Sequence, residues 1–217
     1  MSKKQTAPLL SPKFALALQF ANEIHSTQAR KGAGAPYISH LMAVSALVLE
    51  SGGTETQAIA ALLHDSAEDC GGRPMLDTVR VMFGDDVAGI VEACTDTFDT
   101  PKPDWRPRKQ AYLQAMAGKP ADAKLVACAD KLHNISNTLR DIQGEGIEAW
   151  KVRMAKTPNG AADKQCWYYL GCLEALLNGW SVPLLDEFAR AVWQLCEWVG
   201  SDADLARVDE LTRRLPR

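Results

Sequence analysis

Residues 60–69 read Ala-Ala-Leu-Leu-His-Asp-Ser-Ala-Glu-Asp, an apolar run that turns acidic at His64. On a continuous helix, residues three and four apart share a face, so we expect His64 beside Glu68, and Asp65 beside both Glu68 and Asp69. Carboxylates at that spacing destabilise a helix by about 0.2–0.5 kcal/mol per pair. A bound cation would relieve that repulsion. A solvated acidic helix end is the simpler interpretation, and a His-Asp pair alone would favour it.

The residues on both sides of this run predict helices almost throughout the chain. Ser11-Pro12 places a preferred N-cap before a proline at the first helical position, and Thr54 with Gln57 forms a capping-box pattern. Besides the two helices that start there, we expect helices over residues 41–49, 74–83, 87–94, 107–116, 121–139, 148–156, 163–177, 184–199 and 204–214. Extended structure is suggested only around residues 36–39. The predicted class is all-α.

The expected organisation is a single domain over residues 1–217, because no linker long enough to divide it is present. Residues 11–142 hold the motifs, and the helices of residues 147–217 are expected to belong to the same domain. The composition, 47% hydrophobic and 24% charged, is that of an ordinary globular domain. No apolar run approaches the roughly 18 residues of a membrane span, and no signal peptide is seen. We expect no membrane partner and a cytoplasmic location.

The net charge and the cysteines restrict the classes of function and partner that the sequence allows. With 24 basic and 27 acidic residues the net charge is −3, which argues against a general nucleic-acid binder. A polyanionic ligand would therefore need a local basic cluster or a metal ion. The six cysteines form no C-x-x-C pair and lie in apolar runs, so we interpret them as reduced core residues.

Two further segments carry candidate chemistry. Asp130, in the run Ala-Cys-Ala-Asp-Lys-Leu-His-Asn over residues 127–134, interrupts an apolar helix face one turn before Asn134. A buried charge there must be paired, metal-bound or neutralised, and an ion pair with a neighbouring lysine or arginine is about as plausible as a metal. His40 follows Pro-Tyr-Ile-Ser over residues 36–39, where a lone histidine is more often a capping or core residue.

Taken together, these segments favour a metal site. His40, His64, Asp65 and Asp130 would form a four-ligand set of nitrogen and oxygen without thiolates. Such ligands suit Mn²⁺, Fe²⁺ or Zn²⁺, and the absence of cysteine argues against a structural zinc site.

Three motifs in this order resemble the HD-type hydrolase domain of the RelA/SpoT family. They are Gln-Ala-Arg-Lys through Pro-Tyr-Ile-Ser-His over residues 28–40, the run of residues 61–69, and Ala-Asp-Lys-Leu-His-Asn over residues 129–134. No synthetase or regulatory region follows, so the chain resembles the stand-alone small alarmone hydrolases. The resemblance implies an HD-domain helical bundle that removes pyrophosphate from the 3′ position of (p)ppGpp. The products would be GDP or GTP, and the reaction would tune alarmone levels in the stringent response.

The same resemblance assigns roles by position. His40, His64, Asp65 and Asp130 would hold one divalent metal per chain, typically Mn²⁺, with Zn²⁺ or Fe²⁺ possible. Glu68 and Asp69 would position and activate the attacking water. Contacts to a purine nucleotide with a 3′-diphosphate would come from Arg30, Lys31, Asn134, Asp96, Lys102, Arg106 and Lys109, with Arg108 in the same loop. A homo-oligomer is possible.

The sequence also departs from the family pattern and leaves alternatives open. Leu41 stands where many members carry proline, residues 32–35 are one residue longer than in the bifunctional enzymes, and Asn137 stands where threonine is common. An adenosine alarmone or the 2′-phosphate of NADPH could use the same groups. The basic loop of residues 102–109 could equally be a solvated loop. A non-catalytic nucleotide-sensing regulator is disfavoured, because it would need neither Glu68 nor Asp69.

Overall fold

A computed structural model of the protein describes residues 9–30, 34–157 and 160–215. Within these ranges all regular structure is helical, apart from one isolated antiparallel bridge between Ala29 and Pro36. The helices are α1 (Pro12–Ile24), α2 (Ile38–Glu50), α3 (Glu55–Leu63), α4 (Ser66–Cys70), α5 (Gly72–Phe83), α6 (Asp85–Cys94), α7 (Trp105–Met116), α8 (Ala121–Glu145), α9 (Ile147–Ala155), α10 (Ala162–Leu176), α11 (Pro183–Val199) and α12 (Asp202–Thr212). The all-α prediction is confirmed.

Local signals account for several helix ends. The Ser11 side chain accepts the Lys13 N–H at the start of α1, and both halves of the Thr54–Gln57 capping box are formed at the start of α3. Helix α8 runs six residues beyond the predicted end at residue 139 and stops at Gly146, whose φ of +87° is a conformation that favours glycine. The prediction of extended structure over residues 36–39 is wrong except at Pro36, which forms the bridge with Ala29, because α2 already begins at Ile38.

The run of residues 60–69 is not the continuous helix that its sequence predicts. Helix α3 ends at Leu63, α4 begins at Ser66, and Asp65 between them has ψ of −3°. On a regular helix, consecutive side chains diverge by about 100° and could not reach one point. The break instead allows His64 and Asp65 to approach each other, with 3.1 Å between His64 Nε2 and Asp65 Oδ2.

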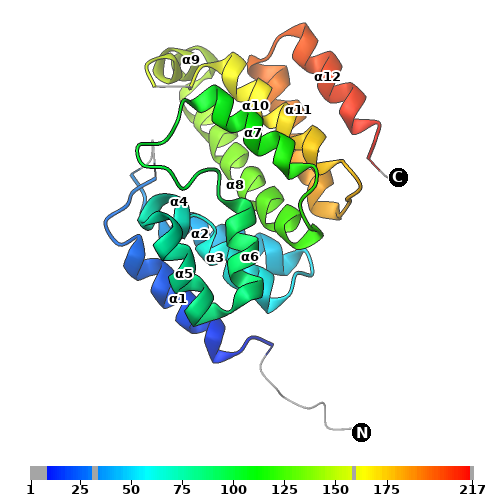
Figure 1. The fold of residues 1–217 in the computed structure, drawn as a ribbon. Helices are drawn as coiled ribbons and strands as arrows, with labels where there is room; N and C mark the ends of the chain where they lie inside the picture. The colour runs from blue at the N-terminus through cyan, green and yellow to red at the C-terminus, as the bar shows by residue number, and fades with distance from the viewer. Residues whose placement is uncertain (1–8, 31–33, 158–159, 216–217) are drawn as a thin grey trace, which may run out of the picture.

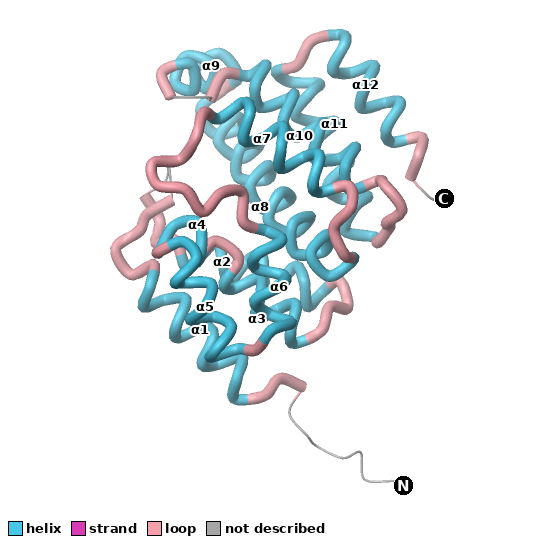
Figure 2. Tube along the Cα trace, in the orientation of Figure 1, coloured by secondary structure: helices cyan, strands magenta, loops and turns pink. Residues whose placement is uncertain are grey.

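The long helix α8 lies between two groups of helices (Figures 1 and 2). It packs against α2, α3 and α6 on one side and against α9, α10 and α11 on the other. Buried apolar side chains from α1 to α12 form one continuous cluster, from Ala17 to Leu211. This continuity supports the expected single domain, which stays a prediction.

Two other observations concern the chain as a whole. All six cysteines are free thiols, and Cys128, Cys166, Cys172 and Cys196 are buried. No helix in the described ranges combines the length and the apolar character that crossing a membrane requires.

Candidate active site

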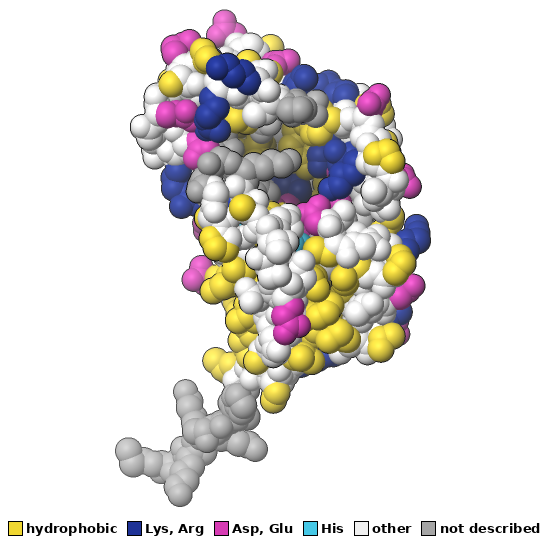
Figure 3. Space-filling view, turned by 90° about the vertical axis from the view of Figure 1, so that its left-hand side faces the viewer, with side chains coloured by type: hydrophobic (Ala, Val, Ile, Leu, Met, Phe, Trp, Pro, Cys, Tyr) yellow, Lys and Arg dark blue, Asp and Glu magenta, His cyan; other side chains and the backbone are white. Residues whose placement is uncertain are grey.

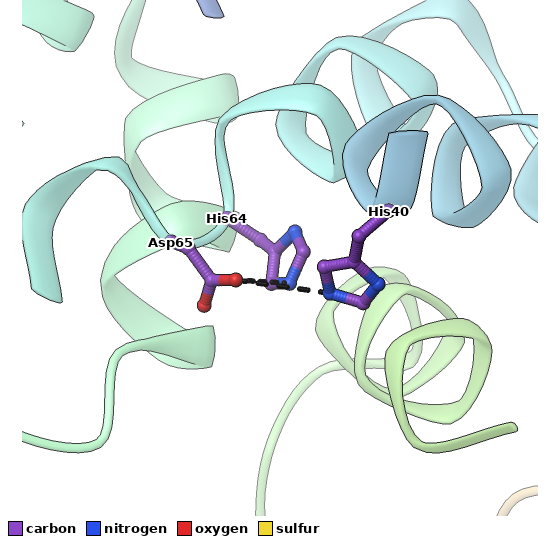
Figure 4. A group of neighbouring side chains, drawn as sticks. All are labelled: His40, His64 and Asp65. Carbon is purple, nitrogen blue, oxygen red and sulfur yellow. Dashed lines mark ion pairs between the residues drawn. The ribbon is translucent and has the colours of Figure 1, made fainter. Parts of the chain in front are cut away.

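The four predicted metal ligands come from three parts of the fold and meet at one point. His40 lies in the first turn of α2, His64 and Asp65 lie between α3 and α4, and Asp130 lies in α8. One ligand atom from each of His40, His64 and Asp65 lies within 4.8 Å of the others (Figure 4). Asp130 Oδ1 is 3.2 Å from Nε2 of His40 and 3.6 Å from Nε2 of His64.

Both imidazoles direct the Nε2 atom toward the carboxylates. His64 Nδ1 lies 2.8 Å from the Ala61 carbonyl oxygen. A carbonyl only accepts, so Nδ1 carries a proton, and in the neutral ring Nε2 keeps a lone pair that a metal ion could bind. Within the described residues, this buried Nε2 makes no hydrogen bond of acceptable angle, although Asp65 Oδ2 is near. An unsatisfied buried polar atom costs about 1–3 kcal/mol, and a metal ion would satisfy this one. The donor set therefore fits a divalent cation.

The electrostatics of the cluster favour a positive charge at its centre. Burial lowers the pKa of His64, but the carboxylates of Asp65 and Asp130 outweigh it and raise this pKa well above the usual value. Burial raises the pKa of both aspartates, but Lys131 beside Asp130 and His64 beside Asp65 outweigh it and lower the two values. Both aspartates are therefore anionic at neutral pH, in a setting that attracts cations.

Glu68 and Asp69 lie on α4 and are both held by Lys102. The Lys102 Nζ is 2.8 Å from Glu68 Oε1 and 3.0 Å from Asp69 Oδ1. The backbone N–H of Asp96 donates to Glu68 Oε2 at 3.3 Å, and Gln28 Nε2 donates to Asp69 Oδ2 at 2.9 Å. Lys102 was expected to contact phosphates, and the structure places it on these two carboxylates.

The basic residues of α7 differ in what they contact: some pair with carboxylates of the site and one packs on an aromatic ring. The Asp96 side chain is buried and pairs with Arg108 and with Lys109, whose Nζ is 2.7 Å away. Arg108 also lies 3.9 Å from Glu68 Oε1. Arg106 instead has its Cζ 3.5 Å from the Trp167 ring centroid. Residues two apart on a helix point in different directions, so Arg108 faces the site and Arg106 does not, contrary to the sequence expectation.

Arg30 and Asn134 are hydrogen-bonded to each other beside the His/Asp cluster. Arg30 donates to Asn134 Oδ1 at 2.9 Å, and Asn134 Nδ2 donates to Asp130 Oδ1 at 2.5 Å. The Arg30 Cζ lies 5.9 Å from the centroid of the Tyr37 ring. Lys31, predicted beside Arg30, lies outside the described residues.

These groups surround one cavity of about 430 Å³. Its lining consists of Gln28, Ala29, Arg30, Tyr37, Asp65, Glu68, Asp69, Cys94, Asp96, Lys102, Lys109, Tyr112, Asp130, Lys131 and Asn134. The volume is within the usual range of about 300–1,000 Å³ for small-molecule sites. Figure 3 shows a hollow in this face with lysine and arginine side chains along its walls. The cavity thus joins a candidate metal cluster, two carboxylates and several cations.

Sequence reasoning assigned no role to three residues that hold the site together. The Tyr37 hydroxyl donates to Asp65 Oδ2 at 2.6 Å, and Lys131 Nζ is 2.5 Å from Asp130 Oδ2. His133 Nδ1 lies 2.7 Å from His40 Nδ1. All three stand inside the motifs that were recognised, so their motif positions were the available signal.

Comparison with known proteins agrees with this geometry. The HD domain family matches residues 17–152, and the chain belongs to this family. Guanosine-3′,5′-bis(diphosphate) 3′-pyrophosphohydrolase MESH1 of Xenopus tropicalis is 37% identical over 137 residues, covering 62% of this chain and 72% of that protein. The Homo sapiens MESH1 protein is 38% identical with the same coverage.

Solved structures show the same relationship. The structure described as a metazoan ortholog of SpoT that hydrolyzes ppGpp has a TM-score of 0.55 and 28% identity, and the match covers 97% of this chain and 98% of that one. The crystal structure of lmo0812 from Listeria monocytogenes EGD-e has a TM-score of 0.63 and 27% identity, covering 73% and 99%. The resemblance to the HD-type hydrolase domain of the RelA/SpoT family is confirmed.

Proposed function

We propose that this chain hydrolyses guanosine 3′,5′-bis(diphosphate) and its pentaphosphate analogue at the 3′ position, giving GDP or GTP and pyrophosphate. The MESH1 relatives carry this activity in their names. The observation that carries the proposal is that Asp65 and Asp130 of the His/Asp cluster line one cavity together with Glu68, Asp69 and several lysine and arginine side chains. Such a cavity has the size to take a small nucleotide, and a bound divalent ion together with the lysine and arginine side chains of its lining would counter the phosphate charge.

His40, His64, Asp65 and Asp130 would hold one divalent metal ion in this proposal. The mixed nitrogen and oxygen donors and the unsatisfied Nε2 of His64 support it. Mn²⁺ is our first assignment, and Zn²⁺ or Fe²⁺ would fit the same donors. A bound divalent ion would lower the pKa of a coordinated water and neutralise phosphate charge.

The residues of the chain would handle the proton and the phosphates. The water oxygen would add to the phosphorus that is attached to the 3′ oxygen. The bond between this phosphorus and the 3′ oxygen would break, and the 3′ oxygen would take up a proton. Glu68 would accept the proton of the water after Lys102, which is 41% exposed, leaves Glu68 to bind a phosphate oxygen; the ion pair of Lys102 with Glu68 supports this role. Arg108 and Lys109 would bind phosphate oxygens by charge-assisted hydrogen bonds.

A substrate panel tests this proposal. The protein is incubated with Mn²⁺ and ppGpp, pppGpp, the matching adenosine 3′-diphosphates or NADPH, and products are separated by anion exchange. We expect GDP or GTP and pyrophosphate from the guanosine compounds. Faster release of pyrophosphate from an adenosine compound, or release of phosphate from NADPH, would assign that compound as the substrate in place of ppGpp. No hydrolysis of any compound by metal-loaded protein would favour a non-catalytic regulator.

The Arg30→Ala variant should mainly raise KM. If Arg30 packs on the purine, the contact exists in both ground and transition states, so kcat should change little. The expected increase is roughly 2- to 30-fold, the scale of a cation–π contact of about 0.5–2 kcal/mol. Steady-state kinetics of Arg30→Ala and Arg30→Lys measure it, and lysine should rescue poorly because it lacks a planar face. A parallel loss of kcat that lysine restores would place Arg30 on the leaving pyrophosphate.

Substitution of Arg108 and of Arg106 tests whether only the first of these two α7 arginines contributes to the site. Arg108→Ala should lower kcat/KM about 10- to 100-fold, because a hydrogen bond to a charged group contributes about 1.5–3 kcal/mol. Arg106→Ala is the matched control and should leave kcat/KM near the wild-type value, since its guanidinium lies on Trp167. Equal losses in both variants would contradict this assignment.

A further inference from the structure

The two histidine ligands have their Nδ1 atoms held by different kinds of partner. For His64 the partner is the Ala61 carbonyl, which can only accept and therefore forces the proton onto Nδ1. For His40 the partner is His133, whose Nδ1 is 2.7 Å from His40 Nδ1. Two ring nitrogens at this distance share one proton, so one of them donates and the other accepts. The tautomer of His40 therefore depends on His133.

Only one of the two arrangements makes His40 a ligand. If His40 donates, its Nε2 keeps a lone pair that faces the cluster, as the Nε2 of His64 does. If His133 donates, Nε2 of a neutral His40 carries the proton toward Asp130 Oδ1, 3.2 Å away, and cannot bind a cation. A change of donor at His133 would thus remove one of the four ligands without moving any helix.

Residues of α2 and of α8 contact His133. The rings of His40 and His133 lie with centroids 4.9 Å apart and planes 34° apart. On α8, Asn137 Nδ2 donates to the His133 carbonyl at 2.9 Å, and Arg140 donates to Asn137 Oδ1 at 2.8 Å. The ring also lines a groove of about 340 Å³ beside α2, together with Leu47, Ser136 and others. Asn137 Nδ2 also lies 3.3 Å from Nδ1 and 3.4 Å from Nε2 of the His133 ring, and because this amide nitrogen only donates, it favours an unprotonated ring nitrogen beside it.

We propose that His133 is a positioning residue that accepts the Nδ1–H of His40 and thereby keeps Nε2 of His40 free to bind the metal. This inference rests on the proposed metal site. Groups that orient a ligand in this way typically contribute 10- to 100-fold to metal affinity.

Metal affinity of substituted proteins tests the role of His133. Zn²⁺ and Mn²⁺ dissociation constants are measured by competition with a chelating dye for the full chain. His133→Phe keeps a ring but no acceptor and should raise the constant about 10- to 100-fold. His133→Asn keeps an acceptor oxygen close to the place of Nδ1 and should regain most of the affinity. Ser136→Ala, in the same groove, is the control and should match wild type.

Each outcome has one meaning. An unchanged constant in His133→Phe, or equal losses in the Phe and Asn variants, would contradict the role of His133. A wild-type protein that binds neither ion would instead contradict the proposed metal site itself.

A second measurement needs no substitution and so cannot fail through misfolding. In the Zn²⁺-loaded wild-type protein, ring ¹⁵N–¹H correlations should show His40 protonated at Nδ1 and His133 unprotonated at Nδ1. A proton on His133 Nδ1 would overturn the proposal.

Discussion

Glu68→Gln is expected to keep nucleotide and metal binding while kcat falls by ~10²–10⁴, the scale of a positioned acid–base group. The amide has the shape of the carboxylate but cannot accept the proton of the attacking water. The Asp96 N–H that donates to Glu68 Oε2 keeps an acceptor oxygen, and Lys102 keeps Asp69 as a partner. Single-turnover rates at saturating substrate measure the loss, with metal content determined on the same sample.

Two controls sharpen this result. Glu148→Gln removes an exposed carboxylate of α9 that pairs with Lys151, at 3.4 Å, and should leave kcat unchanged. Asp69→Asn tests the neighbouring carboxylate. Near-normal turnover in Glu68→Gln together with a large loss in Asp69→Asn would transfer the proton-accepting role to Asp69.

Asp130→Asn is expected to abolish metal retention and, with it, activity. The substitution removes an anionic ligand, and it also leaves the Lys131 ammonium, 12% exposed, without its carboxylate partner. Breaking a buried pair by removing one partner typically costs about 3–5 kcal/mol, so the midpoint of thermal unfolding should fall as well. Elemental analysis after gel filtration measures the metal, and thermal denaturation measures the stability.

Two further variants distinguish the loss of a metal ligand from the loss of a negative charge elsewhere on the protein. Asp65→Asn should also lose the metal, because it removes the second anionic ligand of the cluster. Asp141→Asn, in the same helix as Asp130 but paired with Arg153 at 3.0 Å, should retain it. Full metal content in both Asp130→Asn and Asp65→Asn would contradict the ligand assignment.

Local sequence determined most of the helical architecture. The capping box of Thr54 and Gln57 and the N-cap Ser11 act over three residues or fewer, so they can be recognised without knowledge of the rest of the fold. The end that the sequence predicts for α8, at residue 139, is six residues too early. The helix continues to Glu145, where the glycine at 146 with positive φ ends it.

The residue types of the site could also be recognised from the sequence. His40, His64, Asp65 and Asp130 were recognised as a ligand set, and the structure brings them together. The residue types and the order of the motifs are enough to recognise this ligand set, because the ability of imidazole and carboxylate groups to bind a metal depends on residue type. The expected role of these residues as metal ligands stays a prediction that the Asp130 variant tests.

Only the tertiary structure decided in which direction each side chain points. The break at Asp65 sends two consecutive residues to one point, and the register of α7 places Arg108 in the site and Arg106 on Trp167. The contact of His133 with His40 joins residues 93 positions apart. Such contacts depend on how α8 packs between the two groups of helices, and no local pattern encodes them, because side-chain direction follows from backbone dihedral angles and from distant packing partners.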